Sequence, residues 1–130
     1  MPQGAATLIV AGNLYQALPA VRLVSAANLV QQVKSMTVAW HANYVLKISG
    51  STVNYANENR RISEKVAAAA GDTYRLSCSA NWNNALYVIY AADNSVLACR
   101  QAPNNAAGEV LTDFAVTMPE NTAYFRVAAN

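Results

Sequence analysis

The chain has 130 residues, the size of a single domain, and 12% of them are charged, with a net charge of +2. Binding to nucleic acid needs a clustered basic excess, so this balance argues against such a partner. No apolar run approaches the roughly 20 residues that cross a bilayer, and the N-terminus lacks the basic start and apolar stretch of a signal peptide, so we expect no membrane insertion.

Residues that commonly carry catalysis or bind metals are sparse. His41 is the single histidine, so a catalytic relay or a histidine-rich metal site would have to be built around it. Cys78 and Cys99 form no CxxC pair, and they are either buried free thiols or, if their strands are neighbours, a disulfide. The sequence therefore predicts a domain that is not an enzyme and holds no metal or other cofactor.

The N-terminal quarter differs from the rest of the chain. In residues 25–34, Leu29, Val30 and Val33 share one face at helical spacing, and Ser25 is a suitable N-cap, which predicts one short helix. We assign residues 1–34 to an N-terminal connector or oligomerisation segment and residues 35–130 to a β-sandwich domain.

From Met36 onward, short runs of β-branched and aromatic residues alternate with clusters of Asn, Asp, Gly, Ser and Pro. In residues 44–49, alternation directs Tyr44, Leu46 and Ile48 inward. Residues 86–90 are apolar on both faces, which predicts a central strand. The seven expected strands are 36–40, 44–49, 73–79, 86–90, 96–100, 114–118 and 123–127. The fold class predicted is all-β, an antiparallel β-sandwich.

In the strand expected at 73–79, alternation places Tyr74, Leu76 and Cys78 in the core, which supports an inert thiol at Cys78. Asp93, Asn94 and Ser95 have the turn chemistry of a hairpin that leads into the strand at 96–100.

An ordered set of motifs in the second half of the chain resembles the jelly-roll, carbohydrate-binding-module-like domains of bacteriophage tail fibres and baseplate receptor-binding proteins. These motifs comprise residues 62–66, 70–77, 86–97 and 114–127, and together they span about half of the chain. The resemblance implies a jelly-roll sandwich and a homotrimer. The N-terminal 35 residues depart from the pattern of the family.

A sugar-binding module needs an aromatic face for the apolar side of a pyranose, with planar amides or guanidinium groups for its hydroxyls. Asn81, Trp82, Asn83 and Asn84 supply the aromatic and the amides within a loop expected between two strands. Two interpretations of Trp82 are open: a lid folded over one end of the sandwich, or a ligand platform.

A second polar loop carries Tyr55, Arg60 and Arg61, whose guanidinium groups suit the carboxylate or phosphate of an acidic glycan. The alternative for this loop is a solvated connection. Trp40 and His41 end the first expected strand and complete the candidate ligand-binding set, although Trp40 is better explained as a core residue.

These observations predict a host-recognition or structural module of a bacteriophage tail protein, made in the host cytoplasm and located in the virion tail. Its expected partners are a bacterial surface glycan, other copies of the chain in a trimer, and other tail proteins. The alternatives are a carbohydrate-binding module of a secreted bacterial enzyme and a purely structural oligomerisation or capping domain. An enzyme is the third alternative and requires His41, or a pair of glutamates, in a shared cleft.

Overall fold

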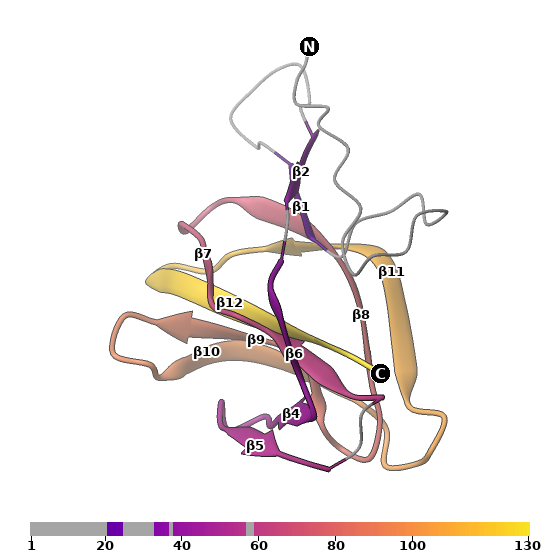
Figure 1. The fold of residues 1–130 in the computed structure, drawn as a ribbon. Helices are drawn as coiled ribbons and strands as arrows, with labels where there is room; N and C mark the ends of the chain where they lie inside the picture. Colours follow the sequence, from indigo (N-terminus) through magenta and orange to yellow (C-terminus); the bar gives the residue numbers. More distant parts are fainter. Residues whose placement is uncertain (1–20, 25–32, 37, 57–58) are drawn as a thin grey trace.

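The computed structural model describes residues 21–24, 33–36, 38–56 and 59–130. Within these residues the protein is all-β: two large antiparallel sheets pack together, and a small hairpin lies below them in Figure 1. The antiparallel β-sandwich predicted from the sequence is confirmed.

The first sheet has four strands, and alternate residues of β8 are buried. Tyr74, Leu76 and Cys78 of β8 point into the core, as their alternation predicts. The strands lie in the order β11 (Glu109–Thr117), β8 (Thr73–Ala80), β1 (Val21–Val24) and β2 (Val33–Met36). Because β1 pairs with both β8 and β2, six residues of the segment assigned to the connector take part in this sheet: Val21–Val24, Val33 and Lys34.

The second sheet has six strands, with β9 between β10 and β12. Strand β9 is buried along most of its length, which confirms the central strand expected there. The strands are β10 (Val96–Gln101), β9 (Ala85–Ala91), β12 (Thr122–Ala129), β6 (Arg61–Ser63) and β3 (Trp40–Ala42) in order, with β7 (Val66–Ala67) also paired to β12.

The hairpin between β9 and β10 closes as the turn chemistry predicts. The Asp93 carboxylate accepts hydrogen bonds from the backbone N–H of Ser95 at 3.0 Å and from its hydroxyl at 2.6 Å. Asn94 has a positive φ of 71°, a conformation that asparagine tolerates.

The core lies between the two large sheets. Leu76 of β8 and Phe125 of β12 are fully buried, and the ring of Tyr74 meets that of Phe125 edge to face at 4.9 Å between centroids. Burying aromatic rings in this geometry contributes about 0.5–1.5 kcal/mol beyond the area that they bury. The contact therefore links the two large sheets within the core, since Tyr74 belongs to β8 and Phe125 to β12.

Strands β6 and β7 run along the same edge of β12, and Ser63 bridges the irregularity between them. Its buried hydroxyl accepts the backbone N–H of Val127 at 2.9 Å and donates to the carbonyl of Glu64 at 2.8 Å. The carbonyl of Ser63 accepts from Arg126 at 2.9 Å. A side chain thus replaces a missing ladder bond, and the hydroxyl and carbonyl of Ser63 both have hydrogen-bond partners.

The small hairpin consists of β4 (Tyr44–Leu46) and β5 (Thr52–Asn54). The expected strand at 44–49 is therefore too long, because a turn begins at Lys47, whose carbonyl accepts the N–H of Gly50 at 2.9 Å. Ile48 lies in this turn and is exposed, contrary to the inward position expected from alternation.

Two expectations near the N-terminus also change. Val33 and Lys34 belong to strand β2 and not to a helix over 25–34; residues 25–32 of that helix lie outside the described part of the chain. The single strand expected at 36–40 is divided, because Met36 ends β2 in one sheet and Trp40 begins β3 in the other. A period-two pattern cannot reveal such a change of sheet, since both segments alternate in the same way.

Candidate functional site

A cleft of about 240 Å³ lies between the small hairpin and the turn that joins β8 to β9. It is lined by Val45, Lys47, Tyr55, Arg60, Trp82 and Asn84. Four of these residues were candidates from the sequence, and they come from two loops that the fold brings together: Tyr55, Arg60, Trp82 and Asn84. The structure adds Val45 and Lys47 from β4 and the turn that follows it.

Alternation along the small hairpin explains which residues face the cleft. Val45 and Lys47 are two positions apart and both line it. Tyr44 and Thr52, in alternate register, line a separate hollow of about 180 Å³ on the other side of the hairpin. The two-stranded hairpin therefore separates two depressions, because successive side chains of a strand point to opposite faces.

Trp82 sits at the tip of a tight turn over residues 81–84. The N–H of Asn84 donates to the carbonyl of Asn81 at 3.0 Å, and φ is positive at both central residues, 54° at Trp82 and 65° at Asn83. This is the pattern of a type I′ turn, which normally favours Asn and Gly. A bulky residue with positive φ is uncommon, and Trp82 in this turn is 49% exposed.

Backbone hydrogen bonds from the next loop hold this turn in place. Trp82 donates to the carbonyl of Asn105 at 3.3 Å, and Asn83 donates to that of Pro103 at 3.4 Å. The side-chain amide of Asn81 donates to the carbonyl of Ala106 at 2.9 Å. Asn81 therefore fixes the neighbouring loop, and neither Asn81 nor Asn83 lines the cleft.

Asn84 and Lys47 both line the cleft and are hydrogen-bonded to each other. The Lys47 Nζ donates to Asn84 Oδ1 at 2.8 Å, and Asn84 is 6% exposed. The backbone carbonyl of Asn84 also accepts the N–H of Ala102 at 2.9 Å. The position of the Lys47 ammonium is thus set by a residue that is itself held by the sandwich.

Tyr55 and Arg60 form the other wall. The Arg60 Cζ lies 4.9 Å from the centre of the Tyr55 ring, within the range of a cation–π contact. Tyr55 is 49% exposed, so both aromatic rings of the cleft present accessible surface. The cleft therefore combines two rings, two cations and one amide.

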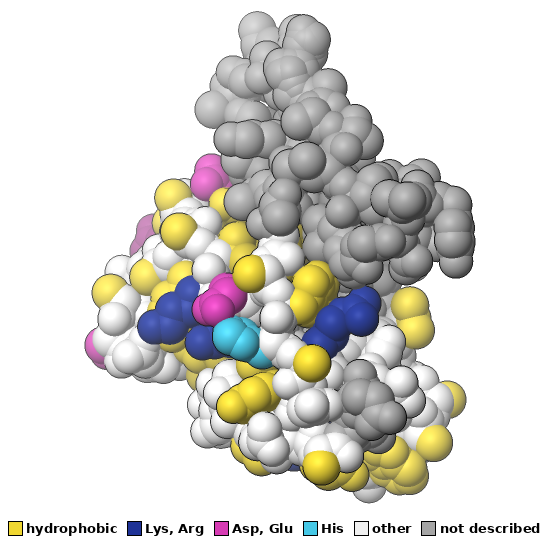
Figure 2. Space-filling view, viewed as in Figure 1, with side chains coloured by type: hydrophobic (Ala, Val, Ile, Leu, Met, Phe, Trp, Pro, Cys, Tyr) yellow, Lys and Arg dark blue, Asp and Glu magenta, His cyan; other side chains and the backbone are white. Residues whose placement is uncertain are grey.

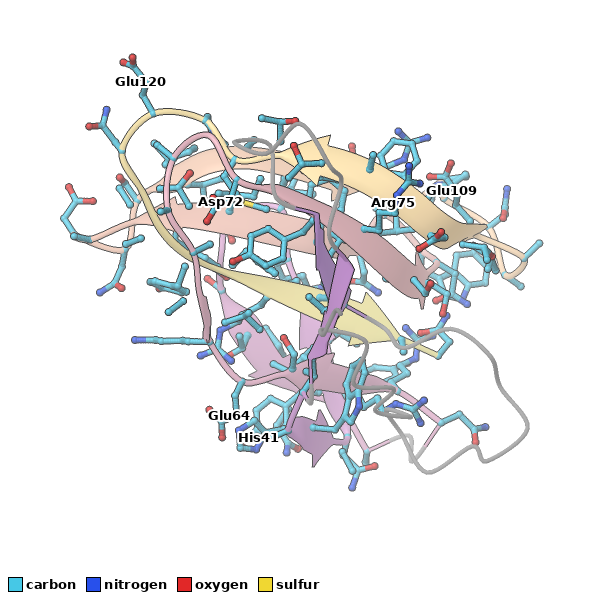
Figure 3. The ribbon with its side chains drawn as sticks, turned by 90° about the horizontal axis from the view of Figure 1, so that it is seen from above. His41, Glu64, Asp72, Arg75, Glu109 and Glu120 are labelled. Atoms are coloured by element: carbon cyan, nitrogen blue, oxygen red, sulfur yellow. The ribbon has the colours of Figure 1, made fainter. Side chains whose placement is uncertain are left out.

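The remaining candidates lie outside the cleft. Arg61 stacks over Trp40, with Cζ 4.9 Å from the ring, and Trp40 packs against the main core. His41 lines the second hollow, and its Nε2 lies 2.5 Å from Glu64 Oε2. Figure 3 shows His41 and Glu64 adjacent, far from Arg75 and Glu109. Figure 2 shows the histidine beside a carboxylate, with basic side chains on both sides.

Lys47 is the functional candidate that the sequence prediction missed. An alternating strand over 44–49 places its side chain on the solvent face, where a lysine is ordinary. The register of the hairpin and the approach of the turn at 81–84 bring it into the cleft. No local sequence signal marks this, since the contact to Asn84 spans 37 positions.

The two cysteines lie in different sheets, Cys78 in β8 and Cys99 in β10, and both are free. Burial raises the pKa of the Cys78 thiol from 9.0 to about 12, with a smaller contribution from Glu109. Across the described ranges no group of three or more His, Cys, Asp or Glu side chains is placed to hold a metal ion. None of the described residues forms a helix long and apolar enough to cross a membrane.

Comparisons of the chain with models of protein families, with curated proteins and with solved structures find no match.

Proposed function

We propose that this protein is a non-catalytic glycan-binding module that recognises a bacterial surface through the cleft between Trp82 and Tyr55. The observation that carries the proposal is the pairing of two half-exposed aromatic rings with fixed polar groups in one concave site. Sugar rings have an apolar face that stacks on such rings and hydroxyls that pair with amides and cations.

The size of the cleft supports a small occupant. Its volume of about 240 Å³ lies below the roughly 300–1,000 Å³ of sites that enclose drug-sized ligands. A single sugar ring at the end or along the side of a polysaccharide suits this space. The remainder of the polysaccharide would lie across the open surface next to the cleft.

The conformation of Trp82 is a second support. A bulky residue with positive φ costs free energy, and such conformations persist where surrounding contacts impose them, often at functional sites. A tryptophan that only covered the end of the sandwich would gain more from full burial. Its exposure of 49% instead leaves ring surface available to a ligand.

The biological setting follows from the motifs that resemble phage tail domains. On that basis we propose that the module belongs to a bacteriophage tail protein, acts in the virion as a trimer and contacts other tail proteins. Burial of Trp82 and Tyr55 would favour a purely structural capping role, and the exposure of both residues gives that alternative no support.

The test is binding of the full chain to an array of bacterial surface polysaccharides, beside the variants Trp82→Ala and Val110→Ala. Val110 is the matched control, because it is a large exposed apolar residue of β11 that does not line the cleft. We expect specific binding that Trp82→Ala abolishes and Val110→Ala retains. Absence of binding by the folded protein, or equal binding by Trp82→Ala, would overturn the proposal.

A further inference from the structure

The cleft is lined by two positively charged side chains, which the binding of a neutral glycan would not require. Lys47 and Arg60 both line it, and of the acidic residues in the described ranges none does. We propose that the cleft selects a sugar carrying an anionic group, a carboxylate or a phosphate, and holds that group between Lys47 and Arg60. This inference rests on the proposed function and specifies the ligand.

The described carboxylates do not line the cleft, and four of them contact other residues. Asp113 Oδ2 lies 3.8 Å from Arg75 Nη1. Glu64 pairs with His41, and Glu109 forms a two-pronged pair with Arg100 at 2.9 and 2.6 Å. Asp93 is bound to Ser95 within its own turn. Asp72 and Glu120 also lie outside the lining of the cleft. The two cations of the cleft are therefore not neutralised by these groups.

Lys47 is positioned to donate to a ligand. Its ammonium has three N–H donors, and the bond to Asn84 Oδ1 at 2.8 Å uses one of them. Because Asn84 is almost fully buried, the ammonium is held at the cleft and loses less side-chain freedom when a ligand binds. An exposed lysine without such a partner would lose more.

Arg60 is held by a different contact. Its guanidinium stacks on Tyr55, a contact that uses the flat face of the group and leaves the N–H donors along its edges. Those donors match the two oxygens of a carboxylate or phosphate. Within the described part of the chain no carboxylate pairs with Arg60.

The neighbouring arginine shows that this placement is specific. Arg61 follows directly in sequence, yet it begins strand β6 and stacks on Trp40, away from the cleft. Of the two arginines that the sequence offered as anion ligands, the fold directs one to the cleft and uses the other for packing. Arg60 and Lys47, from separate elements, then form the anion-binding pair.

The experiment measures binding of the full chain to a panel of bacterial surface polysaccharides, each in native, carboxyl-reduced and dephosphorylated form. The variants are Lys47→Met and Arg60→Met, which remove charge while retaining length, and Lys47→Arg, which keeps the charge. Lys65→Met is the matched control, because Lys65 is an exposed cation that stacks on Tyr124 and does not line the cleft.

We expect the native acidic polysaccharides to bind and the neutralised forms to lose about tenfold or more in affinity, as loss of a charge-assisted hydrogen bond implies. Lys47→Met and Arg60→Met should each cause a similar loss, Lys47→Arg should cause a smaller loss because it keeps the charge, and Lys65→Met should cause none. Loss on carboxyl reduction identifies a carboxylate, and loss on dephosphorylation identifies a phosphate. Affinity should also fall as salt rises.

Equal binding of native and neutralised forms, with Lys47→Met and Arg60→Met unaffected, would overturn this inference and leave a neutral glycan site intact. Failure of every polysaccharide to bind would overturn the proposed function itself.

Discussion

The ammonium of Lys47 donates to the side-chain oxygen of Asn84 at 2.8 Å across 37 positions of the chain. This bond joins the small hairpin to the turn that carries Trp82, and residues of both elements line the cleft. The shape of the cleft therefore depends on a contact between a lysine that the sequence places on the surface and an asparagine that is almost fully buried.

Replacing Asn84 tests that relationship. Asn84→Ala should lower the free energy of unfolding by about 1 kcal/mol, because a net hydrogen bond of this kind is lost. It should also weaken polysaccharide binding, since Lys47 is no longer held. Urea unfolding and a binding titration measure the two effects. Asn104→Ala, in an exposed loop, is the control. An Asn84→Ala protein that is as stable as that control and binds polysaccharide as tightly would contradict the interpretation.

Two glycines with similar backbone angles give a second test. Gly50 and Gly71 have φ of 93° and 89°, but a Cβ at Gly50 would lie 2.8 Å from Val96 Cγ2 and 3.0 Å from Tyr90 Cε2, whereas Gly71 has nothing within 4 Å. Because alanine is strained at positive φ, substitution of either glycine by alanine should lower the free energy of unfolding by about 1 kcal/mol. Gly50→Ala should cost more and should shift the hairpin. Equal thermal midpoints for the two variants would argue against the close packing at Gly50.

Ser63 supplies a third test. Its hydroxyl takes the place of a ladder bond to Val127, so Ser63→Ala leaves a buried N–H without a partner and should destabilise by about 1–3 kcal/mol. Ser49→Ala removes an exposed hydroxyl and should change stability by less than about 0.5 kcal/mol. Indistinguishable urea midpoints for the two variants would show that Ser63 does not bridge β6 and β7.

The two thiols should differ in reactivity. Burial raises the pKa of Cys78 to about 12, so at neutral pH this thiol is protonated as well as inaccessible, while Cys99 is exposed. A thiol reagent should modify one cysteine in the native protein and both in denaturant, and mass spectrometry should locate the native adduct on Cys99. Rapid native modification of Cys78 would contradict its place in the core.

Stability should fall at alkaline pH. Burial raises the pKa of Cys78 from 9.0 and of Tyr90 from 10.0, each to about 12. As pH rises, the unfolded chain loses these protons before the folded protein does. The contribution of the two groups to the free energy of unfolding is therefore complete below about pH 9 and is lost progressively toward about pH 12. Urea unfolding at neutral pH and in this window measures the decline, and Tyr90→Phe should make it shallower. A constant free energy of unfolding across the window would contradict the burial of these groups.

Local patterns predict the parts of this fold in which one strand stays in one sheet. Residues 73–79 alternate and form β8, and the apolar run at 86–90 forms the central strand β9. The failures occur where the chain changes sheet, between Met36 and Trp40, and where a turn replaces the end of a strand, at Ile48. Such changes are decided by long-range pairing, which a local pattern does not contain.

The candidate site, too, could be predicted from the sequence only in part. Trp82 and Tyr55 could be selected from the sequence because aromatic residues in expected polar loops, beside amides or guanidinium groups, suit sugars. That they share a cleft, that Arg60 joins them while Arg61 does not, and that Lys47 completes the set all depend on how two loops meet.

The most direct measurement is an NMR titration of the isotope-labelled full chain with an oligosaccharide fragment of a bacterial polysaccharide that it binds. Our account predicts that the indole N–H signal of Trp82 and the amide signals around Lys47, Tyr55 and Asn84 shift in a saturable manner. The same signals should not shift in Trp82→Ala, apart from the indole signal, which that variant lacks. Shifts confined to the hollow beside His41, or to the turn at Asp93, would contradict it.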